Sequence, residues 1–230
     1  VIDWVNGVAT ATDAKSLASY VAMGYNTCNW VAEKHPKGSG KVKAAWLPGP
    51  PGAGWVLAGE KGCNIAFEGT DVELVHGGFA DTGKETQMGL VENVIQANSS
   101  GGDTELDYII GNAPAIEGAI QVKRDRGFKD LQLVAWYITP GIDLQIKRGN
   151  VEAAPSDQPV VTARVAVDQA VRILEGIDFV TGGAPAFGDP DRISEHIGPK
   201  LSVVEKGDYG AFDSSTTLAP ADFEPVFHVE

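Results

Sequence analysis

The sequence predicts an α/β fold with a parallel sheet that helices cover on both faces. Between residues 41 and 175, apolar runs typical of strands alternate with stretches whose apolar residues lie three or four positions apart. Parallel strands need a crossover helix between them, so this alternation indicates consecutive βαβ units. Open sheets of this kind bind ligands beyond the carboxyl ends of their strands. Function is therefore expected near four strand ends: Gly49, Ala80, Asn112 and Thr139.

The N-terminal part of the chain predicts a strand, a long helix and a second strand. Residues 1–8 are mainly apolar and strand-like, and residues 10–13 form a polar turn. Residues 15–34 are expected to be helical, because apolar residues recur along them at helical spacing. A Pro and two Gly residues between positions 35 and 41 end this helix and precede a strand at 43–47.

The rest of the α/β region continues the alternation as far as a long final helix. The expected helices are 55–67, 84–97, 115–126 and 142–148, and the expected strands are 72–79, 107–111, 131–138 and 151–154. Residues 98–105 are polar and Gly-rich, which predicts a surface loop. Asp157 is expected to cap a helix over residues 158–175, with Pro159 in its first turn. After Gly176 we expect one or two short strands and an extended tail.

The composition bounds the class of protein. A chain of 230 residues with 43% hydrophobic content can bury the core of one large or two small domains. The net charge of -13 disfavours nucleic acid and anionic lipid as partners, since both would be repelled. No apolar run approaches the roughly 20 residues that a membrane-spanning helix needs.

Metal and catalytic motifs are absent from the sequence. The four histidines lie in unrelated contexts without ligand spacing, and no nucleophile motif is present. Cys28 and Cys63 can form one disulfide, but both fall on the apolar side of predicted helices, where cysteine commonly packs as a small buried side chain. Both alternatives stay open, because the sequence does not give the Cα separation that a bridge requires. We expect no metal, no cofactor and no enzyme activity.

Two residues near neighbouring strand ends are candidate ligand contacts. Asn112 ends its strand directly before a helix, so its amide either faces a ligand or caps that helix. Tyr137 lies near the end of the next strand and follows Trp136. Strand alternation would place these two aromatic side chains on opposite faces, so one of them should face a cleft or solvent.

Three further candidates lie in the first part of the chain. Tyr20 is near a helix start and Trp55 follows a turn rich in Gly and Pro, so both either line a pocket or pack in the core. Aromatic faces in such places bind sugars or methylammonium groups. Asn6 is polar within an apolar strand, which indicates pairing at the strand end or contact with a ligand.

Four segments resemble the type I periplasmic binding proteins, in particular those that partner a membrane sensor kinase in trimethylamine N-oxide sensing. They are MGYNTCNWVAEKHPKGSGK, DYIIGNAPAIEGAI, the Pro155-Ser156-Asp157 turn with its helix, and the closing DFEPVFHVE. The resemblance covers essentially the whole chain. It implies two lobes that close on a small ligand, a periplasmic location, and ligand contacts at Asn6, Tyr20, Asn112 and Tyr137, with Trp55 a looser candidate.

The same resemblance implies a domain organisation. Residues 14–154 would form the C-terminal (second) lobe, and residues 1–13 and 155–184 would form the hinge and a remnant of the N-terminal (first) lobe. Residues 185–230 would be a hinge-crossing segment and an extended tail. Because the bulk of the first lobe is absent, the remnant's apolar faces should lack their usual cover, and association with another copy is one way to provide it.

The leading hypothesis is a non-enzymatic periplasmic protein that binds a small polar or methylammonium-type ligand and signals to a membrane sensor histidine kinase. In sugar-binding relatives, the site of Tyr137 tends to be acidic and that of Asn6 basic, so this chain departs from an ordinary pentose site. The alternative is a sugar-type substrate-binding protein of an ABC transporter, with a permease as partner. A ligand-sensing domain of a transcription regulator and an enzyme are further alternatives that the acidic charge and the missing motifs do not support.

Overall fold

A four-stranded parallel sheet forms the centre of the larger unit in the computed structural model, which describes residues 1–5, 10–178, 196–197, 202–208, 212–220, 222–224 and 226. The sheet consists of β4 (Val72–His76), β3 (Val42–Leu47), β7 (Tyr108–Gly111) and β8 (Gln132–Ala135), in that order. Adjacent strands pair in parallel throughout. The expected α/β fold with a parallel sheet is confirmed.

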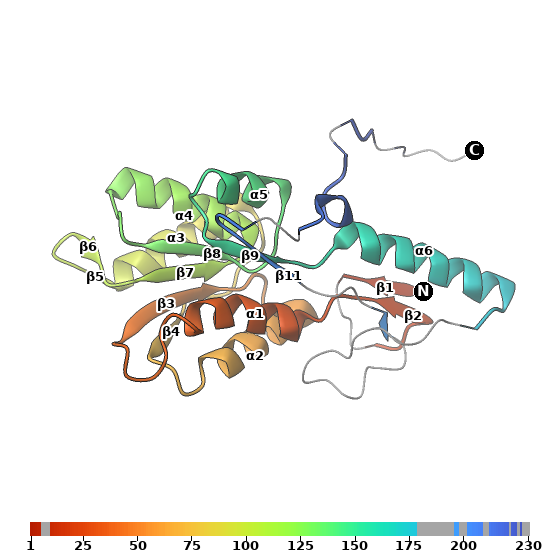
Figure 1. Cartoon of the computed structure of the whole chain (residues 1–230), viewed down its shortest axis with the longest axis horizontal. Helices are drawn as coiled ribbons and strands as arrows, with labels where there is room; N and C mark the ends of the chain where they lie inside the picture. The colour runs from red at the N-terminus through yellow and green to blue at the C-terminus, as the bar shows by residue number, and fades with distance from the viewer. Residues whose placement is uncertain are drawn as a thin grey trace.

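Helices cover both faces of this sheet, as Figure 1 shows. One layer consists of α1 (Tyr20–Ala32) and α2 (Gly54–Phe67), and the other of α3 (Lys84–Ala97), α4 (Ala113–Arg126) and α5 (Pro140–Lys147). Alternate strand residues enter opposite cores: Trp46 and Ile110 pack with the α1–α2 layer, whereas Leu47 and Ile109 pack with the α3–α5 layer. Burial on both sides explains why these strands read as continuous apolar runs.

The α1–α2 contact depends on glycines and on a disulfide. A Cβ atom at Gly24 would lie 1.9 Å from the Gly59 carbonyl oxygen, and one at Gly62 would lie 2.0 Å from the Val21 carbonyl oxygen. One turn beyond Gly24 and Gly59, Cys28 and Cys63 form a disulfide with a Cα–Cα distance of 5.1 Å. Of the two alternatives for these cysteines, the structure therefore selects the bridge.

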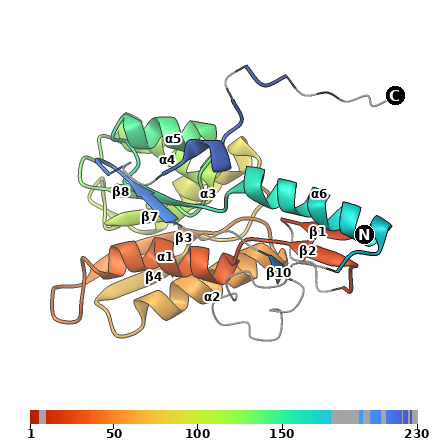
Figure 2. The same ribbon diagram turned by 45° about the vertical axis from the view of Figure 1, so that its right-hand side comes forward.

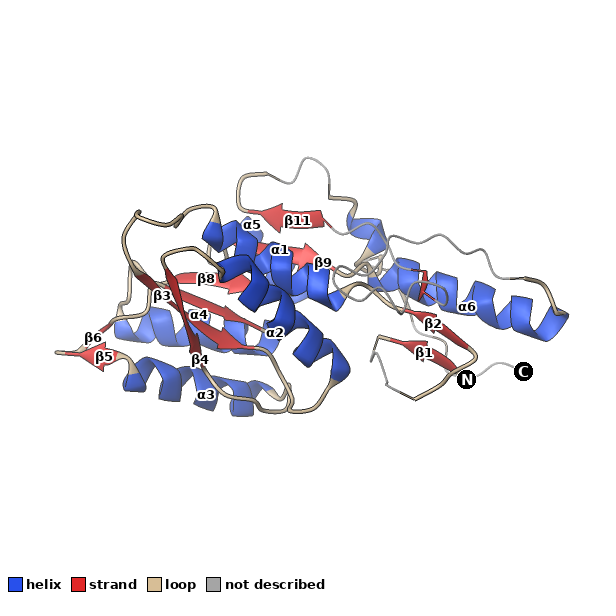
Figure 3. Ribbon diagram, turned by 90° about the horizontal axis from the view of Figure 1, so that it is seen from below, coloured by secondary structure: helices blue, strands red, loops and turns tan. Residues whose placement is uncertain are grey.

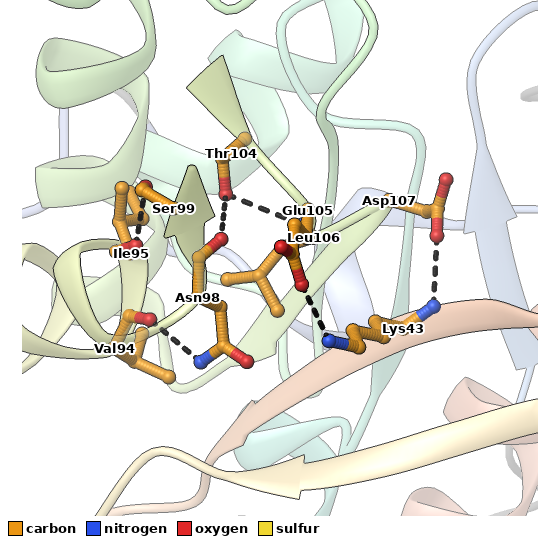
Figure 4. A network of polar contacts seen from close by, with 9 residues as sticks. All are labelled: Lys43, Val94, Ile95, Asn98, Ser99, Thr104, Glu105, Leu106 and Asp107. Atoms are coloured by element: carbon orange, nitrogen blue, oxygen red, sulfur yellow. Dashed lines mark hydrogen bonds and ion pairs between the residues drawn. The ribbon is translucent and has the colours of Figure 1, made fainter. Parts of the chain in front are cut away.

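Residues 98–105 contain a short hairpin, so the predicted surface loop was wrong in part. Strands β5 (Ser99–Ser100) and β6 (Asp103–Thr104) pair antiparallel across two glycines with positive φ angles, which glycine adopts readily. Figure 4 shows how its base is attached. The Lys43 ammonium lies 2.7 Å from the Glu105 carboxylate, and the Lys43 backbone N–H donates to Asp107 at 2.7 Å.

A second, smaller sheet lies beside the central one. It consists of β1 (Ile2–Trp4), β2 (Ala14–Ser16) and β10 (His196–Ile197), all parallel. Figure 2 shows α6 (Pro159–Glu175) running alongside β1 and β2. The Trp4 indole N–H donates to the Thr162 hydroxyl at 3.0 Å, and the Gln169 amide donates to the Lys15 carbonyl at 3.0 Å.

The structure corrects the start of the first helix. Residues 14–16 pair with β1 instead of continuing α1, which begins at Tyr20 with the Ser19 hydroxyl accepting from the Ala22 N–H. A strand of three residues is too short to show a period of its own, so Lys15 and Ser16 were assigned to the helix that follows. The chain therefore passes from the smaller sheet to α1 between Ser16 and Tyr20.

The connection into α6 also differs from expectation. Strand β9 (Ala153–Ser156) pairs antiparallel with β11 (Ser202–Glu205), and Figure 3 shows the pair alongside the central unit, with α6 to the right of it. The α6 N-cap is Gln158, with a φ of 49° and no side-chain cap hydrogen bond, so the predicted Asp157 cap was wrong. Strands β10 and β11 confirm the expectation of one or two short strands after Gly176.

The described part of the tail contains one short 3₁₀ turn, Ser214–Thr216. Beyond it, the described residues to position 226 form neither helix nor strand, and the Phe223 N–H donates to the Pro220 carbonyl at 3.0 Å in a turn. The expected extended tail lies partly outside the described residues. No helix within the described residues combines the length and the apolarity that crossing a bilayer requires.

Candidate functional site

A cavity of about 390 Å³ lies where the central unit meets the smaller sheet. Its walls come from segments that follow strands and from the starts of α1 and α2, so it occupies the carboxyl edge of the sheet, where the sequence predicted function. The lining residues are Val5, Tyr20, Met23, Pro50, Trp55, Thr82, Trp136, Tyr137 and Asp157.

Three aromatic rings form one wall of this cavity. Trp55 stacks on Trp136 with ring centroids 5.2 Å apart and planes 19° apart. Tyr137 meets both rings edge to face, at 6.1 Å from Trp55 and 5.8 Å from Trp136. Trp136 is fully buried, and its indole N–H donates to the Pro48 carbonyl at 3.1 Å. A Cβ atom at Gly59 would lie 2.6 Å from the Trp136 ring, so the absence of a side chain there makes room for the stack.

Asp157 is the one carboxylate among the described lining residues. Burial raises the pKa of Asp157 to about 6, and a hydrogen bond from its own backbone N–H opposes this rise. The described lining contains no Lys, Arg or His that could balance its negative charge. A carboxylate in these surroundings is half ionised at mildly acidic pH and mostly ionised at neutral pH.

Two tyrosine hydroxyls share the cavity with Asp157. Burial raises the pKa of Tyr20 well above its ordinary value, and the negative charges of Asp157 and Asp3 add to the rise. Burial also raises the pKa of Tyr137 to about 12; the Ala113 backbone N–H opposes this effect, while Asp157 adds to it. Both hydroxyls therefore stay protonated at physiological pH and are available as hydrogen-bond donors.

Three of the five candidate residues from the sequence lie together in this cavity. Tyr20, Trp55 and Tyr137 all line it. Asn112 does not: it is fully buried, its side chain accepts from the Ala115 N–H at 3.1 Å, and it donates to the Leu47 carbonyl at 3.1 Å. The structure thus shows Asn112 as the cap of α4, one of its two predicted roles. Asn6 lies outside the described residues.

Sequence reasoning missed Asp157 and Trp136 as lining residues. Asp157 was assigned to the α6 cap, and the strand before it was expected to end at residue 154. In the structure β9 extends to Ser156, so Asp157 directly follows a strand and lines the cavity. Trp136 and Tyr137 were expected on opposite faces, but β8 ends at Ala135, so strand alternation does not extend to them and both line the cavity. Met23, Pro50 and Thr82 gave no signal in the sequence that distinguished them from core or turn residues.

The arrangement is suited to binding. Aromatic faces, two hydroxyl donors and one carboxylate can enclose a small molecule with polar or cationic groups. Within the described part of the chain, no group of three or more His, Cys, Asp or Glu residues is placed to hold a metal ion.

Several known proteins resemble the chain over nearly its whole length. No protein-family model matches the chain. The periplasmic protein TorT of Escherichia coli K12 is 26% identical over 229 residues, which are 99% of this chain and 60% of TorT. The chain thus spans about three fifths of the length of this curated relative.

Solved structures extend the comparison. An ABC transporter solute-binding protein from Bradyrhizobium sp. BTAi1 with bound Bis-Tris is 40% identical, with a TM-score of 0.79, over 99% of this chain and 63% of that one. TorT in complex with the TorS sensor domain in the presence of TMAO is 27% identical, with a TM-score of 0.80, over 99% and 71%. The chain therefore has the type I periplasmic binding protein fold, as the sequence predicted, and is similar over nearly its whole length to TorT and to a solute-binding protein of an ABC transporter.

Proposed function

We propose that this protein is a non-enzymatic solute-binding protein of the periplasm that holds a small polar or methylammonium-type ligand in the cavity between its two units. The observation that carries the proposal is the grouping of Tyr20, Trp55 and Tyr137 around one cavity at the carboxyl edge of the sheet. Aromatic faces of this kind attract methylated amines by cation–π and apolar contact.

The named relatives support this ligand class. TorT was solved with the TorS sensor domain in the presence of TMAO, and the Bradyrhizobium protein holds Bis-Tris. The first molecule is an amine oxide and the second a tertiary amine, so both have a substituted nitrogen.

The periplasm is the compartment of the curated relative. The disulfide between Cys28 and Cys63 fits that location, because disulfides persist in oxidising compartments such as the bacterial periplasm.

Closure around the ligand is the proposed mechanism. Val5 and Asp157 line the cavity from the side of the smaller sheet and α6, whereas Tyr20, Trp55 and Tyr137 line it from the central unit. A ligand that contacts both sides stabilises the conformation in which they are close, and thereby shifts the population toward it.

A membrane sensor histidine kinase is the proposed receptor of the closed form, on the model of the TorS–TorT complexes. The second candidate is delivery of a sugar-type solute to an ABC permease. It is favoured by the 40% identity to a solute-binding protein of an ABC transporter. Binding of the ligand-loaded protein to an isolated TorS-type sensor domain, measured by interferometry, would support the first candidate, and its absence would favour the second.

Calorimetry tests the ligand class. The protein is titrated with TMAO, Bis-Tris, glycine betaine and ribose, and then the same titrations are repeated with Trp55→Ala. We expect at least one amine derivative to bind and the variant to lose about tenfold or more in affinity, since it removes one face of the aromatic wall. Trp30→Phe is the matched control, because Trp30 lies on α1 with its N–H on Glu205, outside the cavity. Absence of binding to all four compounds would refute the proposal.

A further inference from the structure

We propose that Asp157 selects the charge of the ligand, so that the site takes an organic cation whose positive group lies between the Asp157 carboxylate and the rings of Tyr20 and Trp55. This inference rests on the proposed function and adds to it the charge of the ligand. It excludes, as the preferred ligand, both an uncharged sugar and a neutral amine oxide.

The backbone places Asp157 at the cavity wall. The residue follows the last residue of β9, Ser156, whose backbone is held by pairing with β11. Gln158 then takes a left-handed conformation with a φ of 49°, and Pro159 begins α6. This tight turn separates the Asp157 side chain from the N-terminus of α6, which it does not cap, and leaves it among the lining residues.

No described positive charge is positioned to balance this carboxylate. Within the described residues, no ion pair or side-chain hydrogen bond is made by Asp157, and burial is the cause of its raised pKa. The groups that face it are the Tyr20 hydroxyl on α1 and the Tyr137 hydroxyl after β8, both neutral at physiological pH. Burial of an ionised carboxylate without a partner is costly, so a cationic ligand would supply the missing partner.

The charged groups behind these tyrosines do not change this conclusion. Asp3 on β1 acts on Tyr20, and Glu117 on α4 acts on Tyr137; both carry negative charge. Lys15 on β2 is the described cation of this region, and its ammonium lies 4.0 Å from Asp3. The field at the cavity is therefore negative, and it favours a positive ligand.

The pH dependence of binding distinguishes a cation from an amine oxide. A cation needs Asp157 ionised, so its affinity should rise as the pH rises through about 6, the pKa of Asp157 in the folded protein. An amine oxide offers an acceptor oxygen, to which Asp157 can donate only in its protonated form. Its affinity should therefore fall over the same pH range, because the ionised carboxylate repels that oxygen while the tyrosine hydroxyls donate equally at both pH values. The two ligand classes thus give pH profiles of opposite sign.

The test uses tetramethylammonium, a permanent cation with no titratable group, and TMAO as its neutral counterpart. Each is titrated calorimetrically into the wild type, Asp157→Asn and Asp168→Asn at pH 5 and pH 8. Asp168→Asn removes the same charge from the exposed face of α6, where Asp168 pairs with Arg172 at 2.7 Å. We expect tetramethylammonium to bind the wild type and Asp168→Asn about tenfold more tightly at pH 8 than at pH 5. Asp157→Asn should bind it weakly at both pH values.

Each outcome decides one of the two proposals. Equal affinity of Asp157→Asn and the wild type for tetramethylammonium overturns the inference, as does tighter binding of TMAO at pH 5 than at pH 8 with no binding of the cation. In both cases the proposed function stands. If neither probe, nor Bis-Tris, binds the wild type, the proposed function fails and the inference fails with it. The wild-type pH profile does not depend on any variant, and thermal unfolding checks that Asp157→Asn is folded.

Discussion

The central unit and the smaller sheet with α6 bury their side chains in opposite ways. The largest fully buried side chains, among them Trp46, Tyr108 and Trp136, all belong to the central unit, whose sheet is covered on both faces. On α6, by contrast, the buried residues are Thr162 and Gln169. The central unit buries its large apolar side chains in its own core. In contrast, α6 buries polar side chains and exposes apolar ones.

Three exposed apolar residues of α6 form a stripe along the helix. Val167, Val171 and Leu174 lie on one helix face at intervals of four and three residues, and they are 65%, 46% and 86% exposed. These three side chains give α6 an apolar face that is open to solvent. The cavity lies at the border of the two units, so the ligand site combines a wall from the central unit with one from the side of the smaller sheet and α6.

The largest loss of stability should come from a side chain inserted into the close contact between α1 and α2 in the central unit. Gly24→Val would place its Cβ 1.9 Å from the Gly59 carbonyl oxygen, where no side-chain movement can make room because the neighbour is backbone. We expect a loss of more than about 4 kcal/mol in the free energy of unfolding, measured by urea denaturation. Gly89→Ala on α3 is the control, since its Cβ would meet nothing within 4 Å and alanine favours a helix. Native-like stability of Gly24→Val would show that this helix contact is not close-packed.

Removal of the disulfide should have the next largest effect. The bridge between Cys28 and Cys63 closes a loop with a sequence separation of 35 residues, so the double change Cys28→Ala with Cys63→Ala should cost roughly 3 to 4 kcal/mol. Denaturation with and without reductant measures this. The wild type should lose stability on reduction, and the double variant should not respond. A wild type that reductant leaves unchanged would contradict a stabilising role for the bridge.

The partly buried charge of Asp157 at the border should have a smaller, pH-dependent effect. In the folded protein, the pKa of Asp157 is raised to about 6, above an unfolded value of about 3.9, so the folded state binds this proton more tightly. The contribution of Asp157 to stability therefore falls as the pH rises from about 4 to about 6. Without ligand, Asp157→Asn should be more stable than the wild type at pH 8 by about 2 kcal/mol, allowing for partial solvation of the carboxylate.

Denaturation of both proteins from pH 4 to pH 8 measures this difference. Asp168→Asn removes an exposed charge and should change stability by less than about 0.5 kcal/mol at any pH in this range. A constant difference between Asp157→Asn and the wild type would mean that Asp157 is well solvated in the cavity. A destabilised variant at pH 8 would mean that the carboxylate already has a partner in the protein.

The central unit could be predicted from the sequence because its signals are local. The helix expected at 84–97 has those bounds in the structure, and the strand expected at 43–47 differs by one residue. Buried strands and amphipathic helices each carry their own periodicity, so the α/β order followed without knowledge of distant contacts. The same rule for strand ends brought Tyr20, Trp55 and Tyr137 together.

Features that depend on distant segments could not be predicted. The disulfide requires α1 and α2 to approach through Gly24, Gly59 and Gly62, and nothing near either cysteine indicates this. Asp157 has the residue type of a helix cap, and only the position of the turn after β9 shows that it lines the cavity instead. Local patterns describe elements, whereas a ligand site depends on how elements from different parts of the chain meet.

The smallest effect on stability should come from the apolar stripe of α6. Replacing Val167, Val171 and Leu174 together with Gln should change the free energy of unfolding by less than about 0.5 kcal/mol per residue, because all three are largely exposed and Gln is a good helix former. If another copy covers this face in solution, the triple variant should lose concentration-dependent association in analytical ultracentrifugation. Leu57→Gln with Leu144→Gln is the matched control, since these exposed leucines of the central unit lie apart on α2 and α5. Equal sedimentation of the triple variant and the wild type would exclude such association. A loss of several kcal/mol in the free energy of unfolding would show instead that this helix face is packed within the protein. That result would remove the contrast between the two units.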